Sequence, residues 1–352
     1  MQTDVLFEEI PGQDGDVGVI TLNRPTVLNS LNHNIITAML QQLSAWAAAS
    51  TIKAVVITGM GERAFCAGGD LRFTYELHQQ NSNKITAFFQ DEYHLNSLIY
   101  HYPKPYIAFL NGITMGGGVG VSIHGSHRIA TERLNFAMPE TGIGLFPDVG
   151  GTYFLPRLPH RLGLYLGLTG ARINADDCVA LQIAQHKMPA AAFADFIAAL
   201  AATSLQNQAN VTVTTLIESF AIPADASSLM EQASLIESYF AAPTMEALLS
   251  SLSTASHPLM KTAYEALQKK SPMSLKVTLA ALLKGATLTF DACMEQEYCL
   301  VNHFLHNHDF FEGIRAVIID KDQKPTWQPT SLEKVTDEMV QAYFQPMTIA
   351  SL

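Results

Sequence analysis

The first half of the chain alternates short runs of β-branched residues with longer segments whose apolar residues recur at helical spacing. The short runs are rich in Val and Ile, are bounded by Gly, Asn or Pro, and predict strands at residues 5–10, 18–22, 54–58 and 106–110. Apolar residues recur every three or four positions in two segments, which predict amphipathic helices at 34–49 and 84–100. Strands that alternate with helices predict an α/β fold whose sheet is covered by crossover helices.

The pattern changes near residue 175, after which it is almost entirely helical. Helices are expected at residues 190–205, 227–241, 244–252, 261–270, 274–283 and 292–305. Prolines punctuate these segments, as is usual at helix starts and breaks. We therefore expect an α/β core over residues 1–175 and a helical C-terminal region over residues 176–352.

Composition narrows the class of protein. A hydrophobic content of 48% with 15% charged residues fits an ordinary globular chain. The net charge of −11 argues against nucleic-acid binding, which needs a basic face. The chain shows neither an apolar run long enough to span a bilayer nor a basic, apolar leader, so no membrane association and a cytoplasmic location are expected. The four cysteines form no CxxC pair and indicate reduced, structural thiols.

No metal site is expected. His303, His306 and His308 fall where a predicted helix ends, and a surface or capping role is favoured over metal binding. Cys66 has no adjacent base, so packing is favoured over reactivity.

Two glycine-rich segments each follow a predicted strand. Residues 64–71 (AFCAGGDL) come after the strand at 54–58, and residues 111–120 (NGITMGGGVG) come after the strand at 106–110. The second segment opens an expected helix at 119–124. Such turns can expose backbone N–H groups that stabilise negative charge on an oxygen. Tight turns and close helix–sheet packing also favour glycine, so each segment alone has a second interpretation.

A third segment, residues 138–151 (MPETGIGLFPDVGG), carries two carboxylates among apolar residues. Glu140 is compatible with a helix start, and Asp148 with an N-cap. However, apolar neighbours raise a carboxyl pKa, and two carboxyls in different settings can divide acid and base roles.

In this order the three segments resemble the crotonase (enoyl-CoA hydratase/isomerase) superfamily, together with residues 23–31 (NRPTVLNSL). The resemblance implies a crotonase-like (ββα) spiral core. It also implies an oxyanion hole made by the N–H groups of Gly69 and Gly117. Coenzyme A would lie along the first motif, and the residues assigned to it are Arg24, Leu28, Ala67 and Gly69.

The resemblance is more specific to one branch of this family. Hydratases carry a glutamate where this chain has Gly120, whereas Glu140 is retained and Asp148 replaces a usual glycine. This pattern, with residues 271–276 and 312–322, is similar to that of 3-hydroxyisobutyryl-CoA hydrolases. The branch implies hydrolysis of 3-hydroxyisobutyryl-CoA to 3-hydroxyisobutyrate and CoA in valine catabolism, with Glu92 also contacting substrate. CoA is part of the substrate, so no separate cofactor is expected.

Several assignments stay open on the sequence alone. Glu140 is either the nucleophile or a general base, and Asp148 and Glu92 share the remaining roles in a way that the sequence does not specify. The alternatives are an enoyl-CoA isomerase or hydratase that uses Glu140, and a non-catalytic acyl-CoA-binding relative. Acyl-chain specificity and oligomeric state are also open, although the superfamily often forms homo-oligomers.

Overall fold

The computed structural model describes residues 3–80, 82 and 84–347. The chain forms two compact units from interleaved segments. The sheet unit consists of Met1–Gly69, Asp91–Phe136 and Arg172–Met230. The helical unit consists of Asp70–Gln90, Ala137–Ala171 and Glu231–Leu352. The boundary at residue 175 stays a prediction.

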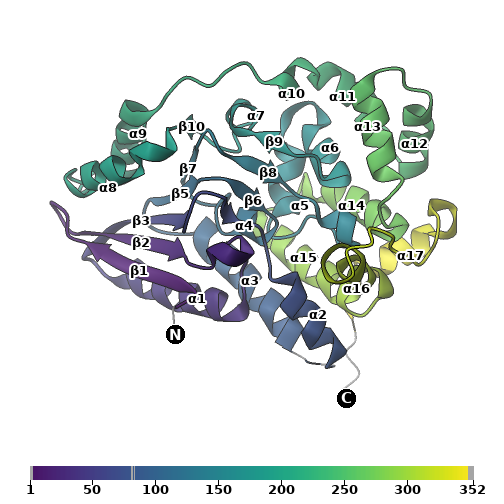
Figure 1. Ribbon diagram of the computed structural model, residues 1–352, viewed down its shortest axis with the longest axis horizontal. Coiled ribbons are helices and arrows are strands. Elements are labelled where there is room, and N and C mark those ends of the chain that lie inside the picture. Colours follow the sequence, from purple (N-terminus) through teal and green to yellow (C-terminus); the bar gives the residue numbers. More distant parts are fainter. Residues whose placement is uncertain (1–2, 81, 83, 348–352) are drawn as a thin grey trace. The chain divides into compact units, whose positions relative to one another are not determined.

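The sheet unit is built on a six-stranded sheet with the order β1-β2-β3-β5-β7-β10 (Figure 1). Only the β1–β2 pair is antiparallel, and the other neighbours are parallel. Its strands are β1 (Val5–Ile10), β2 (Asp16–Leu22), β3 (Ile52–Gly59), β5 (Tyr106–Leu110), β7 (His127–Ala130) and β10 (His186–Lys187). A second sheet has the order β4-β6-β8-β9, with β4 (Ala64–Cys66), β6 (Ile113–Met115), β8 (Asn135–Ala137) and β9 (Ile173–Asn174).

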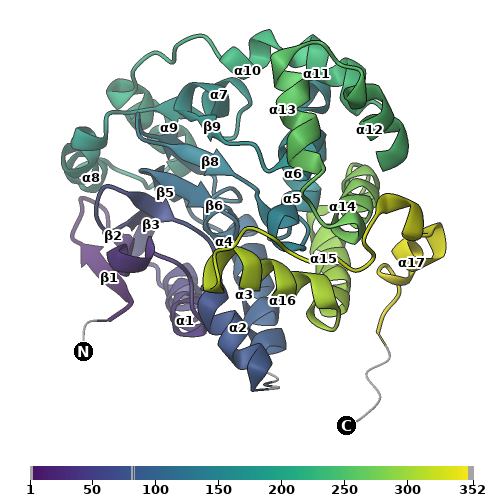
Figure 2. The same cartoon turned by 45° about the vertical axis from the view of Figure 1, so that its right-hand side comes forward.

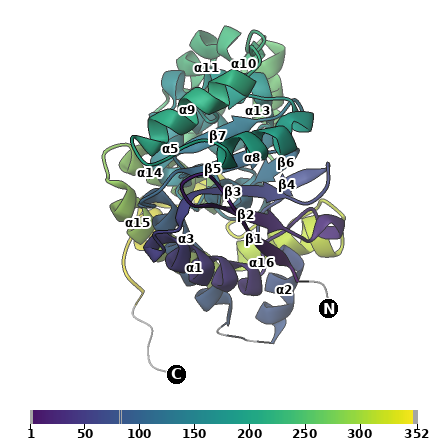
Figure 3. The same cartoon turned by 90° about the vertical axis from the view of Figure 1, so that its left-hand side faces the viewer.

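Alternation of side chains along β2 explains how both faces of the six-stranded sheet are covered. Val17 and Val19 belong to a buried apolar cluster with residues of α8 (Phe193–Ala201) and α9 (Ala209–Phe220). A Cβ added to Gly18, on the opposite face, would meet the Trp46 ring of α1 (His33–Ala48) at 2.8 Å. Figure 3 shows α8 and α9 on one side of these strands and α1 on the other.

The sheet unit also contains one long helix, α3, and three short ones. They are α3 (Lys84–Tyr100), which starts before the unit's second segment, α4 (Gly117–Gly120), α7 (Ala175–Ala180) and α10 (Ser228–Glu231). The helix expected at 119–124 is wrong, because α4 ends at Gly120. Glycine is a poor helix former, and the Ser122 hydroxyl donates to the carbonyls of Gly118 and Val119, where the helix stops.

In the helical unit, α14 packs against several other helices, and ten of its residues are buried (Figure 2). Its helices are α2 (Leu71–Gln79), α5 (Gly151–Phe154), α6 (Leu162–Thr169), α11 (Ala233–Phe240), α12 (Met245–Ser253), α13 (Pro258–Leu267), α14 (Pro272–Gly285), α15 (Phe290–Leu305), α16 (His308–Ile314) and α17 (Asp337–Ala342). Ser271 caps α14 by accepting from Ser274 N, with Pro272 at the first helical position. Among the described helices, none is both long and apolar enough to cross a membrane.

Two of the expected helices are interrupted in the structure. The segment at 190–205 forms a 3₁₀ turn followed by α8, and the segment at 227–241 is divided between α10 and α11. By contrast, β1, β5 and α3 have the predicted bounds.

Candidate active site

The structure brings the two glycine turns of the sheet unit together. A Cβ added to Gly117 would lie 3.5 Å from Gly69 N, and one added to Gly68 would lie 3.5 Å from Gly117 N. The backbone of each turn approaches the other through a glycine with a positive φ angle, +101° at Gly68 and +50° at Gly116. Side chains are strained at such angles, so glycine is required there.

Both peptide N–H groups are available for an external acceptor. Gly117 is the first residue of α4, where an N–H has no partner within the helix. Among the described residues, neither Gly69 N nor Gly117 N donates a hydrogen bond. The oxyanion hole that the family resemblance implies at these two N–H groups stays a prediction.

Glu92 lies against the same turn. It is on α3, its side chain is 2% exposed, and its Oε1 would be only 2.4 Å from a Cβ on Gly117. Glu92, the predicted substrate contact, and Gly117, a predicted oxyanion donor, are thus neighbours. Burial raises the pKa of the nearby Cys66 to about 12, with the charge of Glu92 adding to the effect. Cys66 therefore stays a thiol at neutral pH, which favours its packing role.

The first motif supports these turns. Asn29 donates to the Ala64 carbonyl at 2.8 Å, and Ala67 N donates to the Leu28 carbonyl at 3.0 Å. The Arg24 guanidinium donates to the Ser30 carbonyl at 2.8 Å. These contacts fix the shape of the segment that the resemblance assigns to CoA.

The helical unit holds the two carboxylates of the third motif. Glu140 begins a 3₁₀ turn, Glu140–Ile143, and is 5% exposed, while Asp148 is 4% exposed. Burial raises the pKa of Glu140 well above its usual range, and the charge of Asp148 raises it further. Among the described residues, Oε2 of Glu140 has no hydrogen-bond partner. Glu140 is therefore a buried carboxyl group whose ionisation is disfavoured by its surroundings.

A third carboxylate, Glu297 of α15, fixes the turn that carries Asp148. Val149 and Gly150 both have positive φ, +51° and +85°. Glu297 is fully buried and accepts from Gly150 N at 2.7 Å, from Thr152 N at 2.9 Å and from the Thr152 hydroxyl at 2.6 Å. Burial raises its pKa to about 8, although these hydrogen bonds oppose the shift.

Sequence reasoning missed Glu297, although a signal was present. It lies on the same helix face as Cys293 and Val301, within an otherwise apolar stripe of α15. A charged residue is rarely buried without partners, so its position on such a stripe indicates a structural or functional role.

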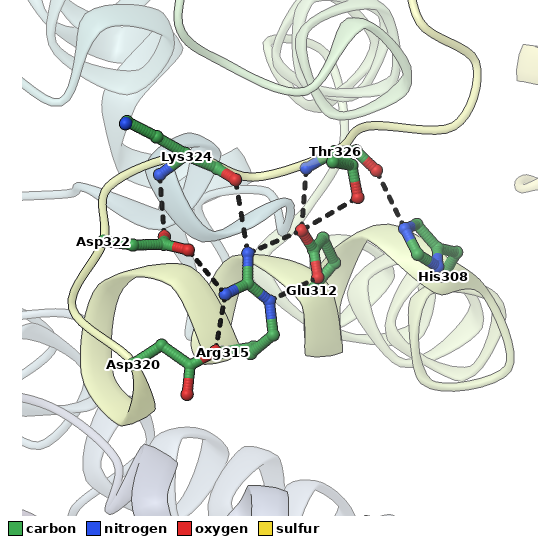
Figure 4. Close-up of polar contacts among 7 residues, drawn as sticks. All are labelled: His308, Glu312, Arg315, Asp320, Asp322, Lys324 and Thr326. Atoms are coloured by element: carbon green, nitrogen blue, oxygen red, sulfur yellow. Dashed lines mark hydrogen bonds and ion pairs between the residues drawn. The ribbon is translucent and has the colours of Figure 1, made fainter.

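A separate cavity of about 660 Å³ lies in the helical unit beside α16 and is not lined by the predicted site residues. Next to it, Arg315 donates to Glu312, Asp320 and Asp322, and Glu312 accepts from Thr326 (Figure 4). The histidines of this region contact backbone carbonyls: His303 that of Gln345, His306 that of Asn302, and His308 that of Thr326. No cluster of three or more potential metal ligands occurs in the described part of the chain.

Comparison with known proteins agrees with this fold. A sequence model of the enoyl-CoA hydratase/isomerase family matches residues 17–344, and the chain belongs to this family. Among solved structures, a carnitinyl-CoA dehydratase from Mycobacterium thermoresistibile is 38% identical with a TM-score of 0.90, covering 99% of this chain and 98% of its own. An enoyl-CoA hydratase from Rhodobacter sphaeroides 2.4.1 is 35% identical with a TM-score of 0.87, covering 98% of each chain. The predicted crotonase-like α/β fold is confirmed.

Curated relatives point to one branch of the family. The 3-hydroxyisobutyryl-CoA hydrolase, mitochondrial, of Bos taurus is 42% identical over 98% of this chain and 90% of its own length. The protein of the same name from Homo sapiens is 41% identical over 99% of this chain and 92% of its own. The predicted resemblance to this branch is confirmed. The predicted cytoplasmic location is wrong, because these relatives are named as mitochondrial proteins.

Proposed function

We propose that this chain hydrolyses the thioester of a short β-hydroxyacyl-CoA, most specifically 3-hydroxyisobutyryl-CoA, to give the free hydroxy acid and CoA. The near full-length similarity to hydrolases of that name supports the substrate. One structural observation carries the choice of reaction. The carboxylates Glu140 and Asp148 are buried together in the helical unit, whereas position 120, where hydratases of the family carry a glutamate, is a buried glycine.

In the proposed mechanism each group has a distinct task. The N–H groups of Gly69 and Gly117 stabilise the negative charge that develops on the thioester oxygen. The Glu140 carboxylate attacks the carbonyl carbon and forms a mixed anhydride as the C–S bond breaks and CoA leaves as the thiolate. Water then opens the anhydride, which releases the acid and restores Glu140. In the alternative role, Glu140 removes a proton from the attacking water.

The β-hydroxyl of the substrate needs its own polar partner. We assign Asp148 and Glu92 to this hydroxyl and to proton handling, since both are buried and each lies beside one of the proposed reacting groups. Arg24, Leu28, Ala67 and Gly69 are assigned to CoA by the family resemblance. CoA belongs to the substrate, and no further cofactor takes part in this mechanism.

The test is Glu140→Gln, which keeps the size of the side chain and removes its charge. Release of CoA from 3-hydroxyisobutyryl-CoA, followed with a thiol reagent, should fall by about 10³-fold or more, while binding of CoA persists. Retention of most of the activity would contradict the mechanism.

The similar solved structures that are described as a dehydratase and a hydratase favour hydration as the second candidate. Loss of enoyl absorbance from crotonyl-CoA would identify a hydratase, and migration of the double bond in a 3-enoyl-CoA an isomerase. A protein that binds acyl-CoA without any turnover would be the non-catalytic relative. Rapid CoA release with neither enoyl reaction would establish the hydrolase.

A further inference from the structure

Lys270 occupies a slot in the helical unit that is lined by two glycines. Its Nζ lies 3.0 Å from the position of a Cβ on Gly142 and 3.5 Å from that of a Cβ on Gly170. Gly170 has φ +67°, a conformation that favours glycine. A Cβ on Gly142 would crowd the ammonium group, whereas one on Gly170 would be in ordinary contact with it.

The backbone around Lys270 is anchored on both sides. Ser271 is fully buried, and its hydroxyl accepts from Ser274 N at 3.0 Å and donates to Asp309 at 2.5 Å. On the other side, the Lys269 carbonyl accepts from the Trp327 indole at 3.0 Å. The side chain of Lys269 is exposed, whereas that of Lys270 points into the slot. The location of the Lys270 charge is therefore set by the fold.

The charged groups around this slot belong to the predicted site. Glu140 begins the turn that contains Gly142, and its charge raises the pKa of Lys270 against the effect of burial. The charges of Asp148, Lys270 and Glu297 all act on the pKa of Glu140. Asp148 and Glu297 disfavour a negative charge on Glu140, whereas the charge of Lys270 favours it. Lys270 makes no direct ion pair with a described residue, so it does not cover the carboxylate oxygens.

We infer that Lys270 is a positioning residue that stabilises the ionised Glu140 carboxylate through space from the Gly142–Gly170 slot. This inference rests on the proposed role of Glu140. A direct ion pair would hold the carboxylate oxygens away from the substrate, whereas a nearby ammonium that does not bind them leaves Oε2 free to attack. A cation placed in this way offsets the burial and the like charges that oppose ionisation.

The test compares the pH dependence of kcat/KM in the wild-type protein with that in Lys270→Met. Burial lowers the pKa of Lys270 to about 8, so the cation is present below that pH and absent above it. The variant should lose about tenfold in kcat/KM at about pH 6, because loss of the cation moves the acid limb of the profile to a higher pH. The two proteins should converge above about pH 9, where the wild-type lysine is also neutral.

Lys269→Met is the matched control, because it removes an exposed charge one residue away, and it should follow the wild-type profile. Lys270→Gln provides a second neutral variant if the methionine variant fails to fold. A loss that is equal at every pH would indicate a purely structural role and overturn the inference, as would an unchanged profile. If Glu140→Gln is inactive while Lys270→Met behaves as wild type, only this inference fails. If Glu140→Gln is active, the proposed mechanism fails.

Discussion

Replacement of Gly117 by alanine tests the contact between the two glycine turns most directly. The added methyl would lie 2.4 Å from Glu92 Oε1, 3.2 Å from Leu31 Cδ1 and 3.5 Å from Gly69 N. The closest atom is the end of a flexible side chain, which can move aside. The contact with Gly69 N is different, because the methyl occupies the space in front of a backbone N–H that has no other acceptor among the described residues.

The structure therefore predicts a large effect on catalysis and a small effect on folding. Loss of one oxyanion donor typically costs about 2.7–4 kcal/mol of barrier, so kcat should fall about 10²- to 10³-fold. Gly117 has no positive φ and opens a helix, so alanine is compatible with its backbone. The backbone contribution of such a Gly→Ala change is only about 0.4–1 kcal/mol, and displacement of the buried Glu92 side chain adds a cost to folding.

The assay measures kcat and KM for CoA release together with the midpoint of thermal unfolding. Gly167→Ala is a suitable control, because it adds the same buried methyl in α6, where the nearest atoms are the ends of Leu155 and Leu282 at 3.1 Å. The control should retain its activity. If Gly117→Ala kept kcat within about threefold of wild type, less than 1 kcal/mol of barrier, the assignment of Gly69 and Gly117 to an oxyanion hole would be refuted.

Two further predictions concern the carboxylates of the helical unit. Glu297→Gln should retain the hydrogen bonds from Thr152 but leave the Gly150 N–H unpaired, which lowers the free energy of unfolding by about 1–3 kcal/mol and lowers kcat. Denaturant unfolding and CoA release check this, and unchanged values of both would contradict it. Arg315 lowers the pKa of Glu312 from 4.5 to about 2, so the stabilisation is complete above pH 4.5 and is lost as the pH falls towards 2. Protection of the amides of residues 320–326, relative to their intrinsic exchange rates at each pH, should fall over that range, and constant protection would refute the prediction.

The sequence predicted those helices and strands whose apolar residues recur at a regular spacing. The strands β1, β2, β3 and β5 and helix α3 follow from the apolar pattern. The short strands β4 and β6, which come directly before the glycine turns, were not predicted. The register pairs Ala64 with Ile113 and Cys66 with Thr114, so the turns after β4 and β6 end at the same edge. Their proximity follows from the parallel pairing of β4 with β6, which the family resemblance implied but the predicted strands did not include.

What the sequence did not predict depends on long-range packing. Glu297 reaches the third motif from α15, and Lys270 does so from the turn between α13 and α14. Both lie far along the chain, and no local pattern shows which residues they meet. Helix α6, Leu162–Thr169, was also missed, because all of its residues are buried and it therefore has no amphipathic pattern. A helix that is apolar on every side cannot be located by periodicity alone.

The charge environment of Glu140 bears on the choice between hydrolysis and hydration. Hydration across a double bond requires two cooperating carboxyl groups, one that donates a proton and one that accepts it. Position 120 carries no carboxyl group, and Lys270 favours the ionised form of Glu140 against burial and the charge of Asp148. In the proposed mechanism Glu140 attacks the carbonyl carbon in its ionised form, and its Oε2 has no hydrogen-bond partner among the described residues. The glycine at position 120, where hydratases carry a glutamate, and the Lys270 charge near Glu140 therefore favour the same reaction, the hydrolysis of a thioester.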